Sequence, residues 1–255
     1  MTAFIYDKTF EGLLTAVFDA FFRKTFPEAL LAEGEPLPLF CDEALTICTD
    51  NEKADRVWKG LQKKLSRTAV SCLTACWLSE LPDIDMLLFR YIRKTFDAPA
   101  SIELNFGDED VLEVSKIYKK VAQESERVLQ FLRFQKAADG TFFAAIEPMY
   151  NVLSLVVNHF QDRFADQKWL IYDLKREYGF YYNLSTVTEV RFEDKESHLL
   201  SGILSDDLMM QDEKFFQQLW KEYFKSITIK ERINPRLHKQ QLPVRFWKYL
   251  TEKQK

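Results

Sequence analysis

The chain has 255 residues, of which 47% are hydrophobic and 29% charged, and its formal net charge is −4. This composition is typical of a globular protein, and a chain of this length buries enough surface to fold without disulfide or metal staples. Only 7 glycines against 22 phenylalanines favour helices over many tight turns.

The sequence also bears on the compartment. No stretch approaches 18 uninterrupted apolar residues, and the N-terminus lacks a basic segment followed by an apolar run, so we expect neither a membrane span nor a secretory signal. Four cysteines in such a chain are typical of reduced thiols. We therefore expect a cytoplasmic protein.

The first half of the chain is predicted to be mainly helical. Asp7 or Thr9 can cap a helix that carries a wide apolar stripe and ends before Pro27. The short apolar run "ALTIC" then indicates a strand or an extended linker, and Asp50 or Asn51 opens another helix. Further helical patterns lie at about residues 67–80, 83–96 and 109–129.

The pattern changes at Phe131. "FLRFQKAADGTFFAAIEP" holds two runs around an Asp139-Gly140 turn, which predicts a hairpin. A helical pattern follows, then "KWLIYDLKREYGFYYNL" predicts two strands around a turn that contains Gly179, and "TVTEVRF" adds a fifth strand. The order hairpin, helix, hairpin predicts an antiparallel sheet with a helix on one face. The fold class is thus α+β, with a mainly helical region at 1–130 and an α+β region at 131–255, packed as one compact unit.

Two cysteines form the sharpest motif. Cys72 and Cys76 resemble the start of the C-x3-C-x2-C motif of radical-SAM clusters, but Ser79 stands where the third cysteine is needed. Residues four apart share a helical face, so we interpret both cysteines as core packing. The three histidines are too scattered for a usual metal site, and we expect neither a metal nor a cofactor.

No common catalytic motif is present, neither G-x-S-x-G, nor Walker A, nor G-x-G-x-x-G. His159 lies four residues before Arg163 on one helical face. A functional interpretation makes it a proton shuttle or a phosphate contact, and a structural interpretation makes it a helix histidine that bonds to a neighbouring backbone group or carboxylate. Asp173, near Arg176, is either a catalytic carboxylate or an ion-paired strand residue. A pocket that holds His159 and Asp173 within hydrogen-bond reach would favour an enzyme, and their dispersal over separate surfaces would favour an interaction module.

The C-terminal tail is the most unusual segment. Residues 225–255 carry nine Lys or Arg against two Glu, hence +7, while the rest of the chain carries −11. Such a segment can lie along phosphates, with aromatic side chains stacking on bases. It can equally dock on its own acidic body, with Phe246 and Trp247 as anchors, or on a partner protein. The sequence pI of about 5.6 favours docking.

Four blocks carry a family resemblance: "FEGLLTAVFDAF", "VLQFLRFQKAADGTFFAAIEP", "VLSLVVNHFQDRFADQKWLIYDLKREYGFYY" and "KERINPRLHKQQLPVRFWKYLTE". They resemble a bacterial family assigned to DNA metabolism, over nearly the whole chain. Members are typically encoded beside a radical-SAM protein, and fused versions precede a domain of the uracil-DNA glycosylase superfamily. The resemblance therefore implies a radical-SAM partner and a glycosylase-type protein as a further partner. This chain has no glycosylase-like motif, so no excision chemistry carries over.

These observations lead to a first hypothesis, an accessory protein of DNA metabolism or repair that acts with a radical-SAM partner and binds nucleic acid through a basic, aromatic surface. The rival hypotheses are a DNA- or nucleotide-modifying enzyme near His159, Asp173 and Arg176, and a protein-docking module without DNA contact. We predict that Asn234, before Pro235, shapes the turn that presents the arginines. The residues predicted to bind nucleic acid are Arg232, Arg236, Lys239, Arg245, Trp247, Lys248, Arg133 and Arg163.

Overall fold

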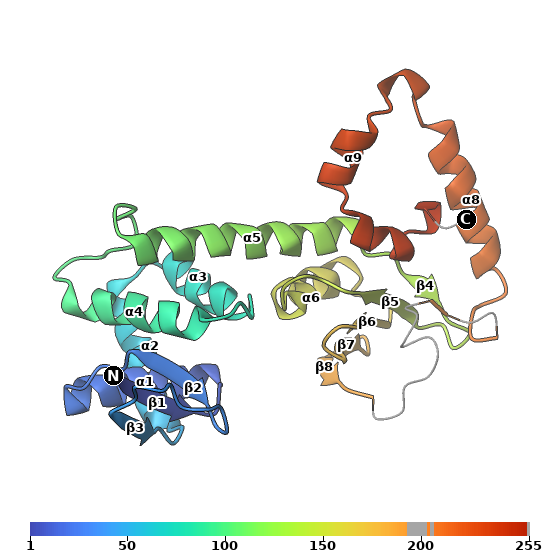
Figure 1. Cartoon of the computed structure of the whole chain (residues 1–255). Coiled ribbons are helices and arrows are strands. Elements are labelled where there is room, and N and C mark those ends of the chain that lie inside the picture. Colours follow the sequence, from blue (N-terminus) through green and yellow to red (C-terminus); the bar gives the residue numbers. More distant parts are fainter. Residues whose placement is uncertain (193–202, 205–206, 254–255) are drawn as a thin grey trace. The chain divides into compact units, whose positions relative to one another are not determined.

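The computed structural model describes residues 1–192, 203–204 and 207–253 (Figure 1). By its contacts the chain divides into two compact units, Met1–Ala122 and Gln123–Lys255, and each is described here by itself. Both helices and strands occur in each unit, so the α+β class is confirmed. Within the described ranges, no helix combines the length and the apolar character that crossing a membrane would require.

The first unit begins with a strand that the sequence patterns did not reveal. β1 (Thr2–Tyr6) is the centre of a parallel sheet of order β2-β1-β3, with β2 at Ala29–Ala32 and β3 at Glu43–Thr46. Its side chains Ala3, Phe4 and Tyr6 are fully buried. A short, continuous apolar run gives no period by which to separate strand from helix, which is why β1 was missed. The predicted extended run at "ALTIC" is β3.

The helices of the first unit begin at residues that satisfy free backbone amides. Thr9 caps α1 (Phe10–Arg23) and Asp50 caps α2 (Asn51–Lys64), as the sequence predicts. Ser66 caps α3 (Arg67–Trp77), which is followed by α4 (Ile84–Asp97) and by α5 (Glu109–Phe131), a helix that continues into the second unit.

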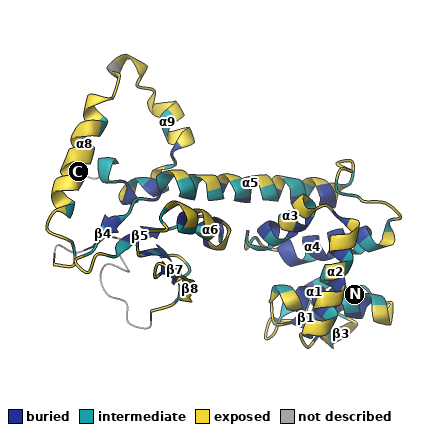
Figure 2. Ribbon diagram, turned by 180° about the vertical axis from the view of Figure 1, so that it is seen from behind, coloured by how far each residue is buried: buried dark blue, intermediate teal, exposed yellow. Residues whose placement is uncertain are grey.

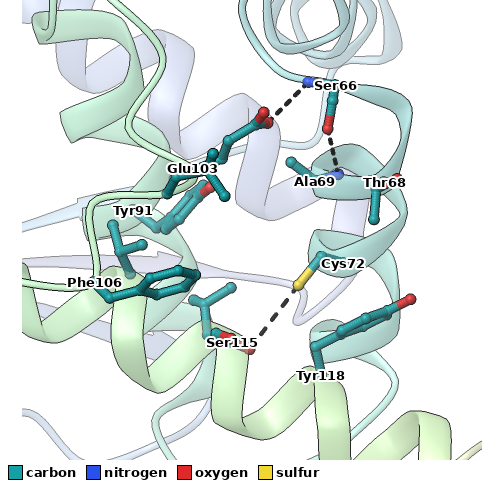
Figure 3. A pocket seen from close by; sticks show the side chains of 12 residues that line it. Ser66, Thr68, Ala69, Cys72, Tyr91, Glu103, Phe106, Ser115 and Tyr118 are labelled. Atoms are coloured by element: carbon teal, nitrogen blue, oxygen red, sulfur yellow. Dashed lines mark hydrogen bonds between the residues drawn. The ribbon is translucent and has the colours of Figure 1, made fainter.

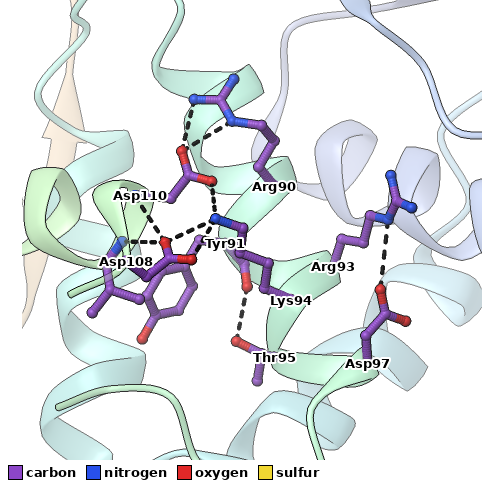
Figure 4. A network of polar contacts seen from close by, with 9 residues as sticks. Arg90, Tyr91, Arg93, Lys94, Thr95, Asp97, Asp108 and Asp110 are labelled. Atoms are coloured by element: carbon purple, nitrogen blue, oxygen red, sulfur yellow. Dashed lines mark hydrogen bonds and ion pairs between the residues drawn. The ribbon is translucent and has the colours of Figure 1, made fainter. Parts of the chain in front are cut away.

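An ion-pair network holds the start of α5 (Figure 4). Asp108 accepts hydrogen bonds from the backbone amides of Asp110 and Val111, and Lys94 of α4 lies 2.7 Å from both carboxylates. Arg90 pairs with Asp110 at 2.9 Å. The helix dipole favours carboxylates at the N-terminus of α5. Because Arg90 and Lys94 of α4 pair with these carboxylates, the network fastens α5 to α4.

The second unit contains a five-stranded sheet of order β4-β5-β6-β7-β8. The strands are β4 (Gln135–Lys136), β5 (Phe142–Ile146), β6 (Trp169–Asp173), β7 (Tyr178–Tyr182) and β8 (Val187–Val190), and α6 (Leu153–Arg163) connects β5 to β6. The predicted hairpins and the fifth strand are present, but the sheet is not wholly antiparallel, because β5 and β6 are parallel. A helical crossover returns the chain to the same end of the sheet, so the strands on either side of it run in one direction.

Gly179 lies in β7 and not in the turn, which is a correction to the sequence prediction. It faces Tyr172 of β6, and a Cβ atom built on it would come within 2.4 Å of the Ile171 carbonyl oxygen. The turn occupies residues 174–177, where Glu177 has a φ of 58°. Glycine is therefore required here by close backbone approach and not by turn geometry.

The C-terminal part of the second unit has two segments. The arm, residues 213–241, comprises α8 (Glu213–Ser226), η1 (Lys230–Arg232) and α9 (Pro235–Gln241), and Figure 1 shows α9 returning from the tip that follows α8. The strap, residues 244–253, comprises the 3-10 helices η2 (Val244–Tyr249) and η3 (Thr251–Lys253). In Figure 2 the arm is coloured exposed along most of its length.

Candidate nucleic-acid interface

The strap is anchored by apolar side chains. Phe246 is 1% exposed and Leu250 is fully buried, while Tyr249 packs in a cluster with Phe143 and Tyr172 of the sheet. The Phe246 ring also lies 5.8 Å from that of Phe131 at the end of α5. Because burying an aromatic or leucine side chain contributes about 1.5–3 kcal/mol, this segment is a structural part of the unit.

Two of the tail's cations face carboxylates of the same unit. Arg245 pairs with Glu124, which is 1% exposed, and Lys248 lies 2.6 Å from Glu147. Trp247 is half-buried and donates a hydrogen bond to the Leu242 carbonyl at 3.1 Å. Arg245, Trp247 and Lys248 thus help to hold the strap in place. That they also bind nucleic acid stays a prediction.

Arg133 is similarly engaged. Its guanidinium pairs with Glu252 of the strap at 3.0 Å and donates to the carbonyls of Gln130 and Leu132. Glu252 also accepts a hydrogen bond from the Trp220 indole at 2.9 Å. Burial alone would raise the pKa of Glu252, but these hydrogen bonds and the Arg133 charge outweigh it, and the net pKa is lowered.

The cations of the arm are in a different situation. Arg232, Arg236 and Lys239 are exposed, and none has a hydrogen-bond or ion-pair partner for its side chain among the residues that the structure describes. Asn234 shapes the start of α9. Its side chain caps this helix by accepting a hydrogen bond from the Leu237 amide at 3.1 Å, and Pro235 lies in the first turn. Arg236 and Lys239 are three residues apart on α9 and are therefore neighbours.

The arm also exposes aromatic side chains. Although α8 is amphipathic, it has no buried residue; Phe215 and Phe216 are each 61% exposed, Tyr223 is 54% and Trp220 is 40% exposed. The amphipathic pattern of α8 alone gives no reason to expect its apolar side to remain uncovered. Contiguous exposed apolar side chains of this kind mark surfaces that bind something.

A cavity of about 520 Å³, here called the arm cavity, lies where the end of α8, η1, α9 and η3 meet. The ionisable side chains among its described lining residues are all basic: Arg232, His238 and Lys253. The Lys253 ammonium lies 5.4 Å from the Phe224 ring centroid and 5.3 Å from that of Trp247. Burial and then the charge of Lys253 lower the pKa of His238. His238 and Lys253 are not among the residues predicted from the sequence, because nothing in the sequence brings together positions 15 apart.

The remaining candidates lie elsewhere in the second unit. His159 is exposed on α6, and Arg163, also exposed, has its guanidinium 5.8 Å from the Phe164 ring. Asp173 is fully buried, pairs with Arg176 at 2.8 Å and accepts from the amides of Lys175 and Arg176. His159 and Asp173 share no hydrogen bond, so the geometry that would favour an enzyme is not formed.

The two cysteines of the radical-SAM-like motif lie in the first unit. Cys76 is fully buried and its thiol donates to the Val114 carbonyl at 3.3 Å, as the packing interpretation predicts. Its hydrogen bond to Cys72 and its burial raise its pKa. Cys72 is half-buried and lines a cavity of about 230 Å³ between α3 and α5, together with Tyr91 and Phe106 (Figure 3).

Comparison with known proteins identifies a family. A model described as a domain of unknown function, DUF4130, matches residues 82–252. The chain belongs to this family. The DUF4130 match begins just before α4 and ends in η3, so it includes the arm and most of the strap.

Two other comparisons add little. A search of curated proteins found no match. Among solved structures, a pGpG-specific phosphodiesterase, PggH from Vibrio cholerae, is similar over 71% of this chain and 81% of its own, with 12% identity and a TM-score of 0.27. Likeness at that level shows neither a shared fold nor a shared activity.

Proposed function

We propose that this DUF4130 protein binds single-stranded nucleic acid through the arm, as an accessory protein of DNA metabolism. The observation that carries the proposal is the contrast within one basic tail. Arg245 and Lys248 face carboxylates, whereas Arg232, Arg236 and Lys239 face solvent without a described partner. A phosphate can replace counterions at the arm without breaking an ion pair, so these three cations are the ones that release counterions on binding.

The aromatic side chains of α8 favour single strands over duplex. Bases of a single strand can stack on exposed rings, and such stacking is tolerant of sequence. Phe215, Phe216 and Tyr223, each more than half exposed, would supply these contacts beside the cations. A duplex keeps its bases stacked on one another and would use the cations alone.

The test is fluorescence anisotropy of a labelled single-stranded DNA oligonucleotide and of its duplex, over a salt series. For the variant R232A/R236A/K239A we expect weaker binding and a salt slope lower by about 2 on the single strand, from about 0.7 for each lost contact. The matched control is K63A/K119A/K120A, which removes three exposed lysines of the first unit. An unchanged slope in the arm variant, or an equal loss in the control, would overturn the proposal.

We further propose that α8 docks the radical-SAM protein that the family resemblance implies, with a glycosylase-type protein as a further partner. The observation in favour is that Phe215 and Phe216 are 61% exposed on a helix without buried residues. Purified radical-SAM protein of the same organism should co-elute with this chain in size-exclusion chromatography, and F215S/F216S should abolish co-elution while R232A/R236A/K239A retains it. Separate elution of the two wild-type proteins would refute this.

A further inference from the structure

The lining of the arm cavity restricts the chemistry of a ligand. Its described ionisable groups, Arg232, His238 and Lys253, are all basic, and they come from η1, α9 and η3. The volume of about 520 Å³ lies within the range of small-molecule sites. A cavity with only basic ionisable groups attracts an anion and disfavours an amine or a metal ion.

Aromatic rings hold two of the three basic side chains, and they do so without neutralising the charge of Lys253. Lys253 lies over the rings of Phe224 and Trp247, and the His238 ring stacks on Trp247 with 5.7 Å between centroids and an interplanar angle of 26°. Arg232 has no described partner for its guanidinium. Aromatic contacts orient a cation but leave its charge available, so a phosphate that enters need not displace a carboxylate.

The other lining side chains are mainly apolar, and the polar ones among them, Thr228, Asn234 and Gln241, carry no charge. Ile229 is 50% exposed, Ile233 is 60% and Leu237 is 51% exposed. A bare phosphate would make no use of them, whereas the flat face of a nucleobase would cover them. The combination of basic groups and an apolar wall fits a nucleotide better than an inorganic anion.

We propose that the arm cavity receives one nucleotide of a bound single strand, with its phosphate against Arg232 and Lys253 and its base against Ile233 and Leu237. This inference rests on the proposed function and deepens it, because the protein would then recognise a nucleotide that is not stacked on its neighbours in the strand. Arg236 and Lys239 do not line the cavity, so in this proposal they would contact the phosphates of neighbouring nucleotides.

The experiment compares an intact oligonucleotide with an abasic one of equal length, which keeps the phosphates but lacks the bases. We expect the wild-type protein to bind the intact strand at least about fivefold more tightly. The variant I233A/L237A should reduce that ratio without changing the salt slope. The variant R236A/K239A should lower the salt slope and keep the ratio, because it removes phosphate contacts that lie outside the cavity. Both variants replace exposed side chains, so their folded cores stay intact.

The outcomes separate the two proposals. A ratio that I233A/L237A leaves unchanged overturns the cavity inference and leaves binding by the arm intact. Salt-sensitive binding with a ratio near one overturns the cavity inference and also the stacking of bases on α8, and leaves only the phosphate contacts of the arm. Absence of salt-sensitive binding to either strand overturns both. A ratio that falls in I233A/L237A and not in R236A/K239A supports the cavity as the site of the base.

Discussion

Replacing Arg245 with alanine tests whether the strap's cations have a structural role. Its partner Glu124 is 1% exposed, and without Arg245 the partners that this carboxylate keeps among the described residues are Arg127 at 3.4 Å and the Met149 amide at 2.7 Å. Breaking a buried pair from one side costs about 3–5 kcal/mol. Because Arg245 is 30% exposed and Arg127 remains, we expect the lower end, about 3 kcal/mol.

The matched control is K248A, which removes the same charge from the same strap. Lys248 and Glu147 are 51% and 39% exposed, and a pair of that kind contributes about 0–1 kcal/mol. Urea unfolding followed by tryptophan fluorescence measures the two losses, and Trp169, Trp220 and Trp247 report on the second unit.

A double variant, R245M/E124Q, removes the buried charge together with its partner. It should recover most of the stability lost in R245A, because no uncompensated carboxylate is left in the interior. Equal losses in R245A and K248A would refute the structural role. So would a fully stable R245A that no longer binds nucleic acid, since Arg245 would then belong to the interface.

Three further predictions follow from single contacts. Gly179→Ala should lower the free energy of unfolding by more than about 2 kcal/mol in urea, because its Cβ would meet the Ile171 carbonyl at 2.4 Å. Glu252→Gln should be less stable than wild type by about 1 kcal/mol at neutral pH. Because the pKa of Glu252 is lowered in the folded state, the carboxylate stabilises the protein fully above the ordinary value of about 4.5, and this stabilisation is lost as the pH falls through the folded-state pKa. The stability difference between Glu252→Gln and wild type should therefore vanish in unfolding curves measured in acid. Burial and the Lys253 charge lower the pKa of His238 below its ordinary value of 6.5, so binding of single strands should strengthen as the pH falls below about 6.5, and anisotropy with His238→Gln should show that part of the pH dependence removed.

Local rules predicted the local features of the fold. Thr9 and Asp50 each cap a helix through their own side chain, and the Asp139-Gly140 turn needs only the positive φ of 84° at Gly140, so neighbouring residues contain the information. The direction of β6 relative to β5 depends instead on where the chain re-enters the sheet after α6, and the role of Gly179 depends on a backbone atom of another strand. Neither can be deduced from residues nearby in sequence.

The candidate site shows the same limit. Arg236 and Arg245 are equivalent by residue type and by tail composition, so the sequence predicts both as phosphate contacts. What separates them is Glu124, which is 121 positions away from Arg245 and lies on another helix. Which arginine is free to bind a ligand is thus a property of tertiary structure, and a net charge of +7 for the tail overstates the charge available at its surface.

The division of the tail into strap and arm also explains how an acidic protein can present a basic surface. The strap places Arg245 and Lys248 against Glu124 and Glu147, which neutralises charge where the segment meets its own unit. The next cation, Lys253, follows directly on Glu252, which pairs with Arg133 and accepts a hydrogen bond from Trp220 of α8, so that η3 is held beside α8. Lys253 therefore reaches the arm cavity only when the strap is docked. If the arm cavity binds a phosphate as proposed, binding and folding of the strap are linked, because an anion that contacts Lys253 stabilises the docked state by mass action.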